Sequence, residues 1–429
     1  MGAVSAVTAS VAAAGGAAFA APDYPSWNDV EKAKQNESTK QAEIATLGEL
    51  LNGLASQAAR AVTTAQIAAE AYRVTQDALD AATLRETSLS EQAATAEATA
   101  ATSKMRAGLI AAHLAKSGAS GLSLNLFLNG NSADDLLSQL GTASKLSEQS
   151  EQIYTEAVQD KNAAESLGEQ AASATEERER LTEESKTTFD AATASSTAAE
   201  AAYNTQQRKS SELFEQLALL KDTTAEAERS FHAGEDAAAA ASALAQAQAS
   251  AAAIADAAAA QAVRDTAAAA GSGSGAGSGS GSGSGSVAPS VPATPSPPVA
   301  LPNASIVDTA LAFANAQLGD RYVFGGSGPD AWDCSGLTKA AYAAAGVYIG
   351  THSATNQYNT MASQGKLVSF AQVQVGDLVF WGSPGNYYHV AIYAGNGQVL
   401  EAPNPSSRVR VHSIWSSWAV APYVGRPAA

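Results

Sequence analysis

The sequence predicts an α+β domain with a small antiparallel sheet, preceded by a long α-helical hairpin. Two observations support this fold class. Residues 27–116 are rich in Ala, Glu, Gln, Lys and Leu and contain no proline, which is the composition of helices. From Asn303 onward, two helical patterns are followed by a run of short strand patterns, the order expected of an α+β domain.

Residues 1–22 have the features of a secretory signal peptide, except that they lack a Lys or Arg at the start. They are small and apolar and contain Ala18-Phe19-Ala20, an A-x-A-like cleavage site. We expect a signal peptide whose basic start is truncated; the alternative is a plain Ala-rich tail. No later run approaches the ~18 consecutive apolar residues of a membrane span. The mature protein is therefore expected to be secreted and not itself membrane-spanning.

Residues 23–268 are predicted to form an antiparallel helical hairpin, a coiled coil with its tip at residues 117–131. In the first arm, apolar residues recur at spacings of three and four and form a stripe that needs a partner helix: Leu47, Leu50, Leu51, Leu54, Ala58 and Val62. Glycines flank a compact apolar cluster at the tip: Leu122, Leu124, Leu126, Phe127 and Leu128. This cluster is either a packed helix corner or a docking site for another protein.

The second arm is predicted to begin at Ser132, an N-cap residue followed by Asp134 and Asp135 in the first turn. The helical pattern continues to about Asp265, with a bend expected at Gly234. At ~1.5 Å per residue, the two arms would reach on the order of 130 and 200 Å.

Residues 269–302 are predicted to be a linker between the hairpin and the last domain. They carry no charge, and a Gly-Ser half is followed by a Pro-rich half. The first half is expected to be flexible and the second extended and stiffer. Such a linker would let residues 303–429 move independently of the hairpin.

The net negative charge of the protein comes entirely from residues upstream of the last domain. The chain has 42 acidic and 25 basic residues and a net charge of −17, whereas residues 303–429 hold six of each kind. Such an acidic surface argues against nucleic acid or anionic lipid as a partner. The single cysteine, Cys334, excludes an intrachain disulfide and a Cys-based zinc site.

Residues 303–429 change from helical to strand patterns along the chain. Helices are predicted at 306–318 and 334–345, with a short extended approach at 322–324, and strands at 377–381, 389–394, 398–402, 409–412 and 419–424. Asn396-Gly397, between two apolar runs, is the strongest short-range hairpin signal in the chain.

Cys334 is the candidate nucleophile. It follows a glycine-rich approach and the pair Trp332-Asp333, and it opens the second helix of this domain. Unpaired N–H groups and the helix dipole favour thiolate over thiol at a helix start, so we expect the pKa of Cys334 to be lowered. The alternative is a buried and inert cysteine.

A cysteine nucleophile needs a base and a third group that orients the base. His113 and His232 lie in the helical arms, which leaves His352, His389 and His412. His389 begins a strand, where alternation directs its side chain to one defined face of the sheet, and it is therefore the candidate base.

Glu401 and Asn404 are both candidates for the third group. A strict two-residue loop at Asn396-Gly397 would pair His389 with Asn404 and place Glu401 on the opposite face of the sheet. A bulge or a longer loop would return Glu401 to the face of His389. Periodicity leaves both possibilities open.

Five short motifs, taken together and in this order, resemble the NlpC-type cell-wall cysteine peptidases, a papain-like family. They are Tyr322, the GGSGPD run at 325–330, DCSGL at 333–337, GDL at 376–378, and HVAIYAGNG from His389 with Glu401 twelve residues after it. The whole arrangement of signal peptide, coiled coil, linker and peptidase is similar to actinobacterial peptidoglycan hydrolases of the Rip type.

The resemblance implies catalysis by Cys334 as nucleophile, His389 as base and Glu401 as third residue. It also implies that three further residues line the substrate cleft: Tyr322, Asp333 and Ser335. Asp333 has a second possible role as the N-cap of the Cys334 helix. His352 matches a polar stretch that faces the cleft in relatives but is as compatible with a surface position, and His412 is expected to be structural.

The function implied by the resemblance is hydrolysis of the bond between D-glutamate and the diamino acid of peptidoglycan stem peptides. The enzyme would act in the cell wall or extracytoplasmic space during daughter-cell separation, without a metal or organic cofactor. One alternative is a CHAP-type amidase, which would cut between sugar and peptide. Another is an adaptor that acts mainly through the coiled coil and has a weak hydrolase activity.

The linker would also permit the hairpin to fold back over the cleft. We therefore expect autoinhibition, relieved when a divisome membrane protein contacts the tip of the hairpin. Similar coiled-coil hydrolases use an FtsX-like protein as this partner.

Overall fold

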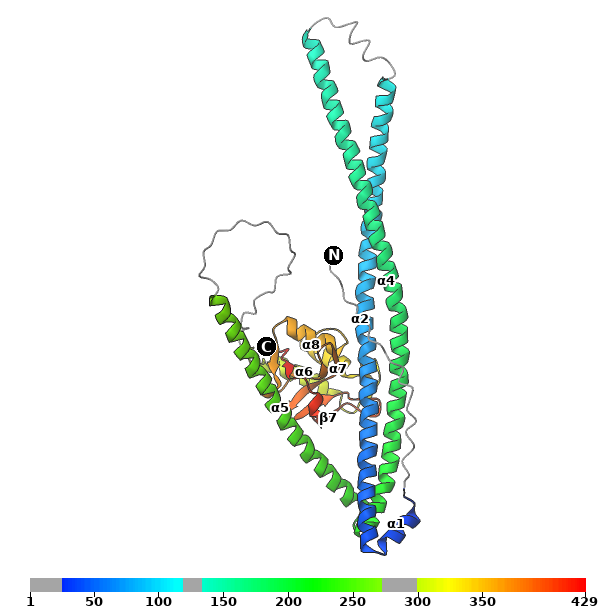
Figure 1. Cartoon of the computed structure of the whole chain (residues 1–429), viewed down its shortest axis with the longest axis vertical. Helices are drawn as coiled ribbons and strands as arrows, with labels where there is room; N and C mark the ends of the chain where they lie inside the picture. The colour runs from blue at the N-terminus through cyan, green and yellow to red at the C-terminus, as the bar shows by residue number, and fades with distance from the viewer. Residues whose placement is uncertain (1–24, 119–132, 272–298) are drawn as a thin grey trace.

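The computed structural model describes residues 25–118, 133–271 and 299–429. A short helix α1 (Trp27–Lys34) leads into the first arm of the hairpin, α2 (Glu37–Gly118). The second arm, α4 (Ala133–Lys221), returns antiparallel to α2, and α5 (Ala225–Gly271) then leaves the base of the hairpin (Figure 1). The described residues therefore contain the predicted long helical hairpin.

The base of the hairpin has its own hydrophobic core. Its buried residues are Val30, Ala33, Leu47, Leu51, Leu54, Leu213, Leu217 and Leu220. The stripe predicted in the first arm supplies three of these leucines, because residues three and four apart share one face of a helix. Farther along, buried alanines such as Ala174, Ala192 and Ala199 form the seam, which buries less apolar area per residue.

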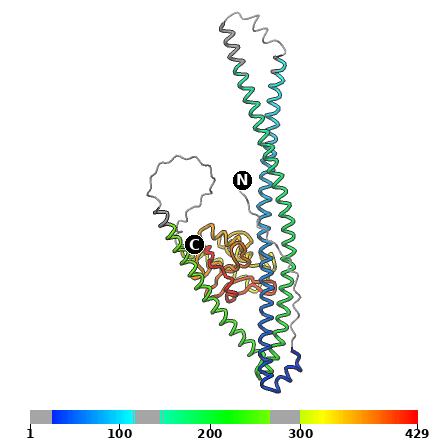
Figure 2. The backbone as a smooth tube through the Cα atoms, in the orientation of Figure 1, coloured from blue at the N-terminus to red at the C-terminus, as the bar shows by residue number. Residues whose placement is uncertain are grey.

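The helix is interrupted at residues 222–224, and not at Gly234 where a bend was expected. Asp222 has a φ of 53°, in the left-handed region, and the hydroxyl of Thr224 accepts the N–H of Ala227 at 3.2 Å to start α5. Asp and Thr favour such caps and turns, whereas a lone glycine inside a helix costs only about 1 kcal/mol. The second arm is therefore shorter than predicted, and α5 diverges from it (Figure 2).

Several predicted features lie outside the described residues. They are the signal peptide at 1–22, the apolar cluster at 122–128, the N-cap Ser132 and most of the linker at 269–302. Within the described ranges, no helix has both the length and the apolar character needed to cross a membrane.

The C-terminal domain combines three helices with a six-stranded sheet. The helices are α6 (Ala304–Ala316), α7 (Cys334–Ala344) and α8 (Ala354–Ser363), and a parallel pair, β1 (Arg321–Tyr322) and β2 (Ala331–Trp332), precedes α7. The sheet strands are β3 (Leu367–Ser369), β4 (Leu378–Ser383), β5 (Asn386–Gly395), β6 (Gln398–Glu401), β7 (Arg410–Ser413) and β8 (Tyr423–Gly425). Their order is β3-β8-β4-β5-β6-β7 with antiparallel neighbours, which confirms the predicted α+β fold class.

Each face of this sheet is packed by different helices. One face packs on α6, α7 and α8 through residues that include Ala310, Leu337, Tyr342, Met361, Phe380 and Ile392. The other face includes Val379, Tyr393 and Val399 and packs on Leu244, Ala247 and Ala251 of α5. The domain thus lies between α2 and α5, in the V that these two helices form (Figure 1).

The structure adds two elements to this domain and shortens one predicted strand. Neither β3 nor α8 was predicted; α8 has Ser353 as its N-cap, and it buries the polar Gln357 where an apolar residue would have marked a helix. The strand expected at 419–424 is reduced to β8, because a 3-10 helix occupies Ser417–Ala419. The hairpin at Asn396-Gly397 is confirmed, with φ values of 53° and 72° as a type I′ turn requires.

Candidate active site

Cys334 is the first residue of α7. The preceding Asp333 caps this helix, since its Oδ1 accepts the N–H of Gly336 at 2.8 Å. Gly336 also permits close packing on the glycine-rich loop, because a Cβ at this position would lie 2.1 Å from the carbonyl oxygen of Gly326. The motif DCSG thus holds the candidate nucleophile at a helix start and against the preceding loop.

The pKa of the Cys334 thiol is raised well above its usual value, contrary to the lowered pKa expected from the helix start. Burial is the main cause, and the negative charges of Asp333 and Glu70 add to it. The backbone N–H groups of Val390 and Ser335 act in the expected direction but are outweighed. Since Glu70 belongs to α2, part of the shift originates outside the C-terminal domain.

His389, the candidate base, is fully buried on β5. Its Nε2 lies 3.0 Å from Oε2 of Glu401, and its Nδ1 lies 3.3 Å from the side-chain nitrogen of Gln66 in α2. An amide nitrogen only donates, so Nδ1 accepts and Nε2 carries the proton toward Glu401. In this tautomer Nδ1 offers the lone pair that a general base needs.

Glu401 is on the same side as His389 because of a β-bulge. Tyr393 pairs with Val399, but Gly395 pairs with Gln398, so the register shifts by one residue between them. Of the two arrangements left open by the sequence, the structure therefore has the one that joins Glu401 to His389.

Two residues missed by sequence reasoning support Glu401. Arg410 donates to Oε1 through Nε and Nη2 at 3.2 and 3.1 Å, and the indole N–H of Trp415 donates to Oε2 at 3.0 Å. Burial alone would raise the pKa of Glu401, but the hydrogen bond and charge of His389 and the charge of Arg410 together lower it. Glu401 is thus held as an ionised carboxylate that can stabilise a charged imidazole.

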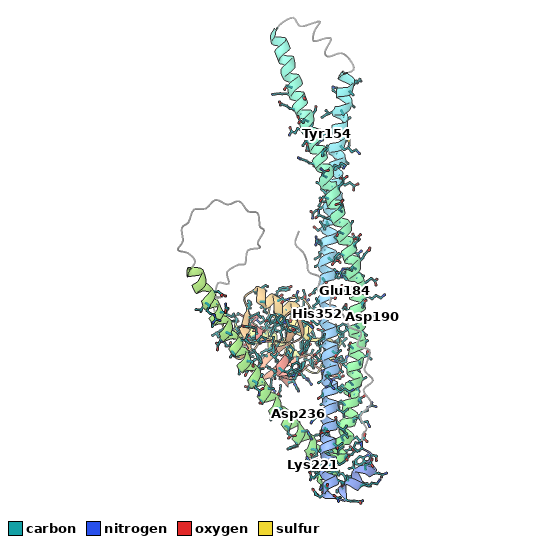
Figure 3. All side chains as sticks on the ribbon, in the orientation of Figure 1. Tyr154, Glu184, Asp190, Lys221, Asp236 and His352 are labelled. Atoms are coloured by element: carbon teal, nitrogen blue, oxygen red, sulfur yellow. The ribbon has the colours of Figure 1, made fainter. Side chains whose placement is uncertain are left out.

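The three residues expected to line the cleft lie around Cys334. Tyr322 and Ser335 are buried, and the charges of Asp333 and Cys334 add to the burial that raises the pKa of Tyr322. Asp333 binds Nε2 of His352 at 2.6 Å, so His352 joins the site and is not a plain surface residue. Figure 3 labels His352 where the domain faces the hairpin. His412 is exposed on β7.

Helix α2 lies across this site and contacts it through one polar face. Gln66 donates to the carbonyl oxygen of Pro403 at 2.7 Å in addition to facing His389, and Arg73 binds Oδ2 of Asp333 at 3.2 Å. Asp77 accepts a hydrogen bond from Thr351. The positions 66, 70, 73 and 77 are spaced by three and four, so they share one face of α2.

Glu70 makes the most complete of these contacts. Its carboxylate accepts the Ser353 hydroxyl at 2.6 Å and the N–H groups of Ala354 and Thr355 at 3.0 and 2.8 Å, which caps α8 from outside the domain. Glu70 is only 4% exposed. Sequence reasoning missed it because a charged helix residue ordinarily faces solvent, and only the helical spacing of the polar residues that follow Val62 could have indicated a buried polar face.

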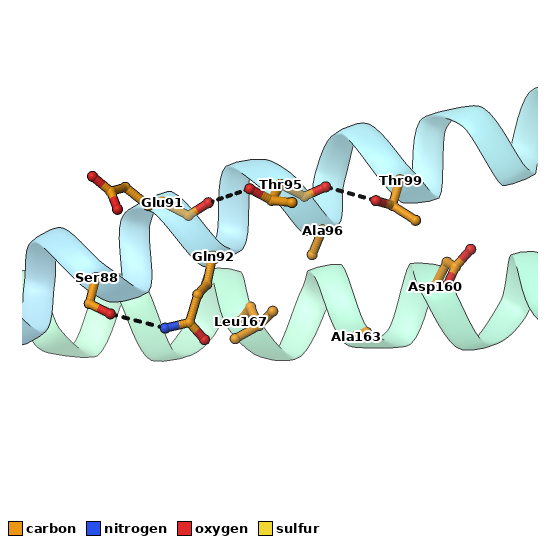
Figure 4. Close-up of a pocket in the computed structure, with 9 residues that line it drawn as sticks. All are labelled: Ser88, Glu91, Gln92, Thr95, Ala96, Thr99, Asp160, Ala163 and Leu167. Carbon is orange, nitrogen blue, oxygen red and sulfur yellow. Dashed lines mark hydrogen bonds between the residues drawn. The ribbon is translucent and has the colours of Figure 1, made fainter.

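A separate surface groove opens between the two arms of the hairpin (Figure 4). It is lined by Ser88, Glu91, Gln92, Thr95, Ala96, Thr99, Asp160, Ala163 and Leu167. It holds neither a thiol nor an imidazole, so it is not the chemical site. In the described parts of the chain, no group of three or more His, Cys, Asp or Glu side chains is arranged to hold a metal ion.

A cysteine at a helix start, together with a buried histidine and carboxylate on the following sheet, defines a domain of the cysteine-peptidase type. Residues 319–425 match the model of the NlpC/P60 family, so the C-terminal domain of this chain is an NlpC/P60 domain.

Curated relatives match part of the chain. The chain is 38% identical over 112 residues to the peptidoglycan endopeptidase RipA of Mycolicibacterium smegmatis, covering 26% of this chain and 21% of that one. It is 35% identical over 153 residues to RipB of Mycobacterium tuberculosis, covering 32% and 61%. Protein P54 of Enterococcus faecium is 41% identical over 105 residues, which are 24% of this chain and 19% of that protein.

Among solved structures, the NlpC/p60 domain of the peptidoglycan hydrolase SagA is 39% identical and is covered to 97%, with 28% of this chain and a TM-score of 0.24. The P60 domain of the Mycobacterium avium subspecies paratuberculosis antigen MAP1204 is 31% identical and covered to 96%, with 29% of this chain and a TM-score of 0.26.

Proposed function

We propose that the protein is a secreted peptidoglycan endopeptidase that hydrolyses the bond between D-glutamate and the diamino acid of stem peptides during daughter-cell separation. The observation that carries this proposal is the pairing of His389 with Glu401 in a domain that has Cys334 at a helix start. Support comes from relatives named peptidoglycan endopeptidases, which share the C-terminal domain with this chain.

In the proposed reaction, Nδ1 of His389 takes the thiol proton of Cys334, and the sulfur attacks the carbonyl carbon of the scissile amide. Glu401 orients the imidazole and stabilises its charged form. The imidazolium then gives its proton to the leaving amine of the diamino acid, which leaves an acyl-thioenzyme. Water, deprotonated by the same imidazole, releases the acyl product and regenerates the thiol. The N–H of Cys334 would help to stabilise the oxyanion.

The polar groups of the cleft suit a charged peptide. The start of α8 offers three hydrogen-bond donors to a carboxylate, and in this conformation Glu70 occupies them. Asp333 binds a cation, which in this conformation is Arg73. Stem peptides carry both carboxylates and amino groups, so the same partners would serve them once α2 has left. Tyr322 and Ser335 would complete the walls of this cleft.

The conformation described is proposed to be a latent one, as the hypothesis of autoinhibition anticipated. Gln66 engages the lone pair of His389 that would remove the thiol proton. Glu70 raises the pKa of Cys334 and fills the site at the start of α8. Departure of α2 would free the base and lower the pKa of the thiol. A divisome membrane protein of the FtsX-like kind, contacting the hairpin tip, is proposed as the trigger.

The energetics of the α2 contact support a reversible latch. Oε1 of Gln66 and Nε of Arg73 are buried without a hydrogen-bond partner, and each such atom costs roughly 1–3 kcal/mol. Burial of the Glu70 carboxylate adds a desolvation cost, which also raises the pKa of Glu70 to about 7. The coupling free energy between an allosteric partner and a second site is typically about 1–3 kcal/mol. This is comparable to the cost of one buried atom that lacks a hydrogen-bond partner.

Mass spectrometry of the products released from purified peptidoglycan tests the proposed bond. The full chain carrying Glu70→Ala is compared with the same chain carrying Cys334→Ala in addition. We expect peptides that end in D-glutamate only when Cys334 is present. Intact stem peptides released from their sugar would indicate a CHAP-type amidase instead. No products, combined with normal separation of cells that carry Cys334→Ala, would favour the adaptor.

A further inference from the structure

The two helices that flank the C-terminal domain hold it by different chemistry. Helix α5 packs on the sheet with small and apolar side chains, Leu244, Ala247 and Ala251, and completes the core that contains Phe370, Tyr393 and Val399. Ala251 is 2% exposed, and its carbonyl oxygen accepts the hydroxyl of Ser369 at 3.2 Å. Detaching α5 would expose an apolar sheet face to water.

Helix α2 contacts the domain through several polar groups and one aromatic ring, Tyr72, whose centroid lies 5.5 Å from that of Phe324. Gln66 and Glu70 are buried there and Arg73 is partly buried, all with hydrogen-bond partners, but one atom of Gln66 and one of Arg73 have none. Water can replace these hydrogen bonds when α2 leaves, whereas it cannot replace the apolar contacts of α5. The α2 contact is therefore the one that opens at the lower cost.

The connectivity of the chain agrees with this difference. Residues 269–302 join the end of α5 to the start of α6, so they connect two parts of one body if α5 stays on the sheet. That body is then continuous with the hairpin only through residues 222–224, between α4 and α5.

Residues 222–224 have the features of a hinge. Asp222 has a φ of 53°, and its ion pair with Lys34, at 2.6 Å, is solvent-exposed and therefore weak. Glu228 of α5 binds Lys221, the last residue of α4, at 2.8 Å and Thr223 at 2.7 Å, so these contacts keep the start of α5 joined to the end of α4 at the hinge. A change of φ and ψ at a few such residues is how hinged bodies swing.

We infer that α5 and the C-terminal domain move as one body, which swings about residues 222–224 to uncover the cleft while α2 and α4 stay paired. This inference rests on the proposed latch. It differs from the expectation drawn from the sequence, in which the linker at 269–302 is where the domain moves relative to the hairpin.

Two disulfide staples in the full chain carrying Glu70→Ala test the inference. The α5 staple joins Ala251→Cys to Ser369→Cys, and the α2 staple joins Asp77→Cys to Thr351→Cys; both pairs of residues are in contact in the structure. Peptide mapping is used to check that Cys334 forms no disulfide with the introduced cysteines. Each variant is compared with its own reduced form, so that a folding defect is not mistaken for the effect of the staple.

We expect the α5 staple to leave the release of peptidoglycan fragments within about twofold of the reduced form, and the α2 staple to lower it at least tenfold. A tenfold loss with the α5 staple, restored by reduction, would show that α5 must detach and would overturn the inference. Full activity with the α2 staple would instead overturn the latch on which the inference rests.

Hydrogen exchange needs no staple and covers the case in which the cysteine variants fail to fold. In the full chain carrying Glu70→Ala, amides of Ala354 and Thr355 should exchange at least tenfold faster than in the wild type. Amides of residues 244–251 and 368–370 should keep their rates within about twofold. Equal acceleration of both sets would mean that α5 leaves the sheet, which contradicts the inference.

Discussion

The side-chain nitrogen of Gln66 lies 3.3 Å from Nδ1 of His389, although 323 positions separate the two residues in the chain. The opposite nitrogen of the same imidazole lies 3.0 Å from Glu401. A helix of the hairpin therefore contacts the atom through which a Cys-His pair would exchange its proton. The proposed catalysis and the proposed latency therefore involve the same imidazole.

Replacing Glu70 by alanine should open the cleft. The change removes three hydrogen bonds, each worth about 0.5–1.5 kcal/mol for a protonated carboxyl, so their combined loss predicts at least a tenfold rise in the open population. The rate of alkylation of Cys334 by iodoacetamide measures this directly, because the chain has no other cysteine. Glu91→Ala, on an exposed position of the same helix, is the matched control. An unchanged alkylation rate would argue against the latch.

The latch should weaken as the pH rises. Burial raises the pKa of Glu70 to about 7 in the latched form, against 4.5 for a free glutamate, so the latched form holds its proton more tightly than the open form. The latch is therefore strongest below about pH 4.5 and is lost progressively as the pH rises through about 7. Burial shifts the pKa of Asp77 in the same direction.

Small-angle scattering of the full chain at pH 5 and pH 8 measures this dependence. We expect a compact particle at pH 5 and a more extended average at pH 8. Glu70→Gln keeps the shape of the side chain without its charge and should remove most of the difference. A chain that is more extended at pH 5 would have the opposite sign and would exclude Glu70 as the titrating group.

Glu401 should matter through the orientation of His389. In the chain opened by Glu70→Ala, Glu401→Ala is expected to lower kcat/KM on the order of 10²-fold, and Glu401→Gln by less, because the amide oxygen can still accept from Nε2. Asn404→Ala tests the alternative strand register, in which Asn404 and not Glu401 would lie beside His389. A large loss in Asn404→Ala with none in Glu401→Ala would reverse the assignment of the third residue.

Arg426 should be important for stability and not for chemistry. It is 4% exposed, and it binds both oxygens of the buried Asp377 at 3.0 and 2.9 Å. Removing one partner of such a pair leaves an uncompensated buried charge, so Arg426→Met is expected to lower the free energy of unfolding by about 3–5 kcal/mol. Arg321→Ala, at an exposed position, should change it by less than about 0.5 kcal/mol. Chemical denaturation of both variants provides the comparison, and equal stabilities would contradict this account of Asp377.

The sequence predicted much of the C-terminal domain because its signals are local. Cys334 follows a capping residue, and Asn396-Gly397 adopts the turn that its composition favours. The pairing of His389 with Glu401 depends on a bulge between Tyr393 and Gly395, and a period of two residues cannot place a bulge. Family resemblance, and not periodicity, favoured Glu401.

The contacts by which α2 covers the cleft could not be predicted, because they join distant parts of the chain. Glu70 has the sequence context of an ordinary exposed helix residue, yet it caps α8. The break at Asp222 had no glycine or proline to mark it, and only the structure shows that α5 packs on the sheet and not in the hairpin. Both features depend on tertiary contacts, so no local pattern in the sequence marks them.

We propose that α2 holds a cysteine hydrolase in a latent state, and this claim is tested by the rate of fragment release from purified peptidoglycan. The full chain is compared as wild type, as Gln66→Ala/Glu70→Ala, and as the same double variant with Cys334→Ser. We predict that the double variant releases fragments at least tenfold faster than the wild type and that the loss of the thiol abolishes release. Equal rates for the wild type and the double variant, or release that persists without Cys334, would contradict the claim.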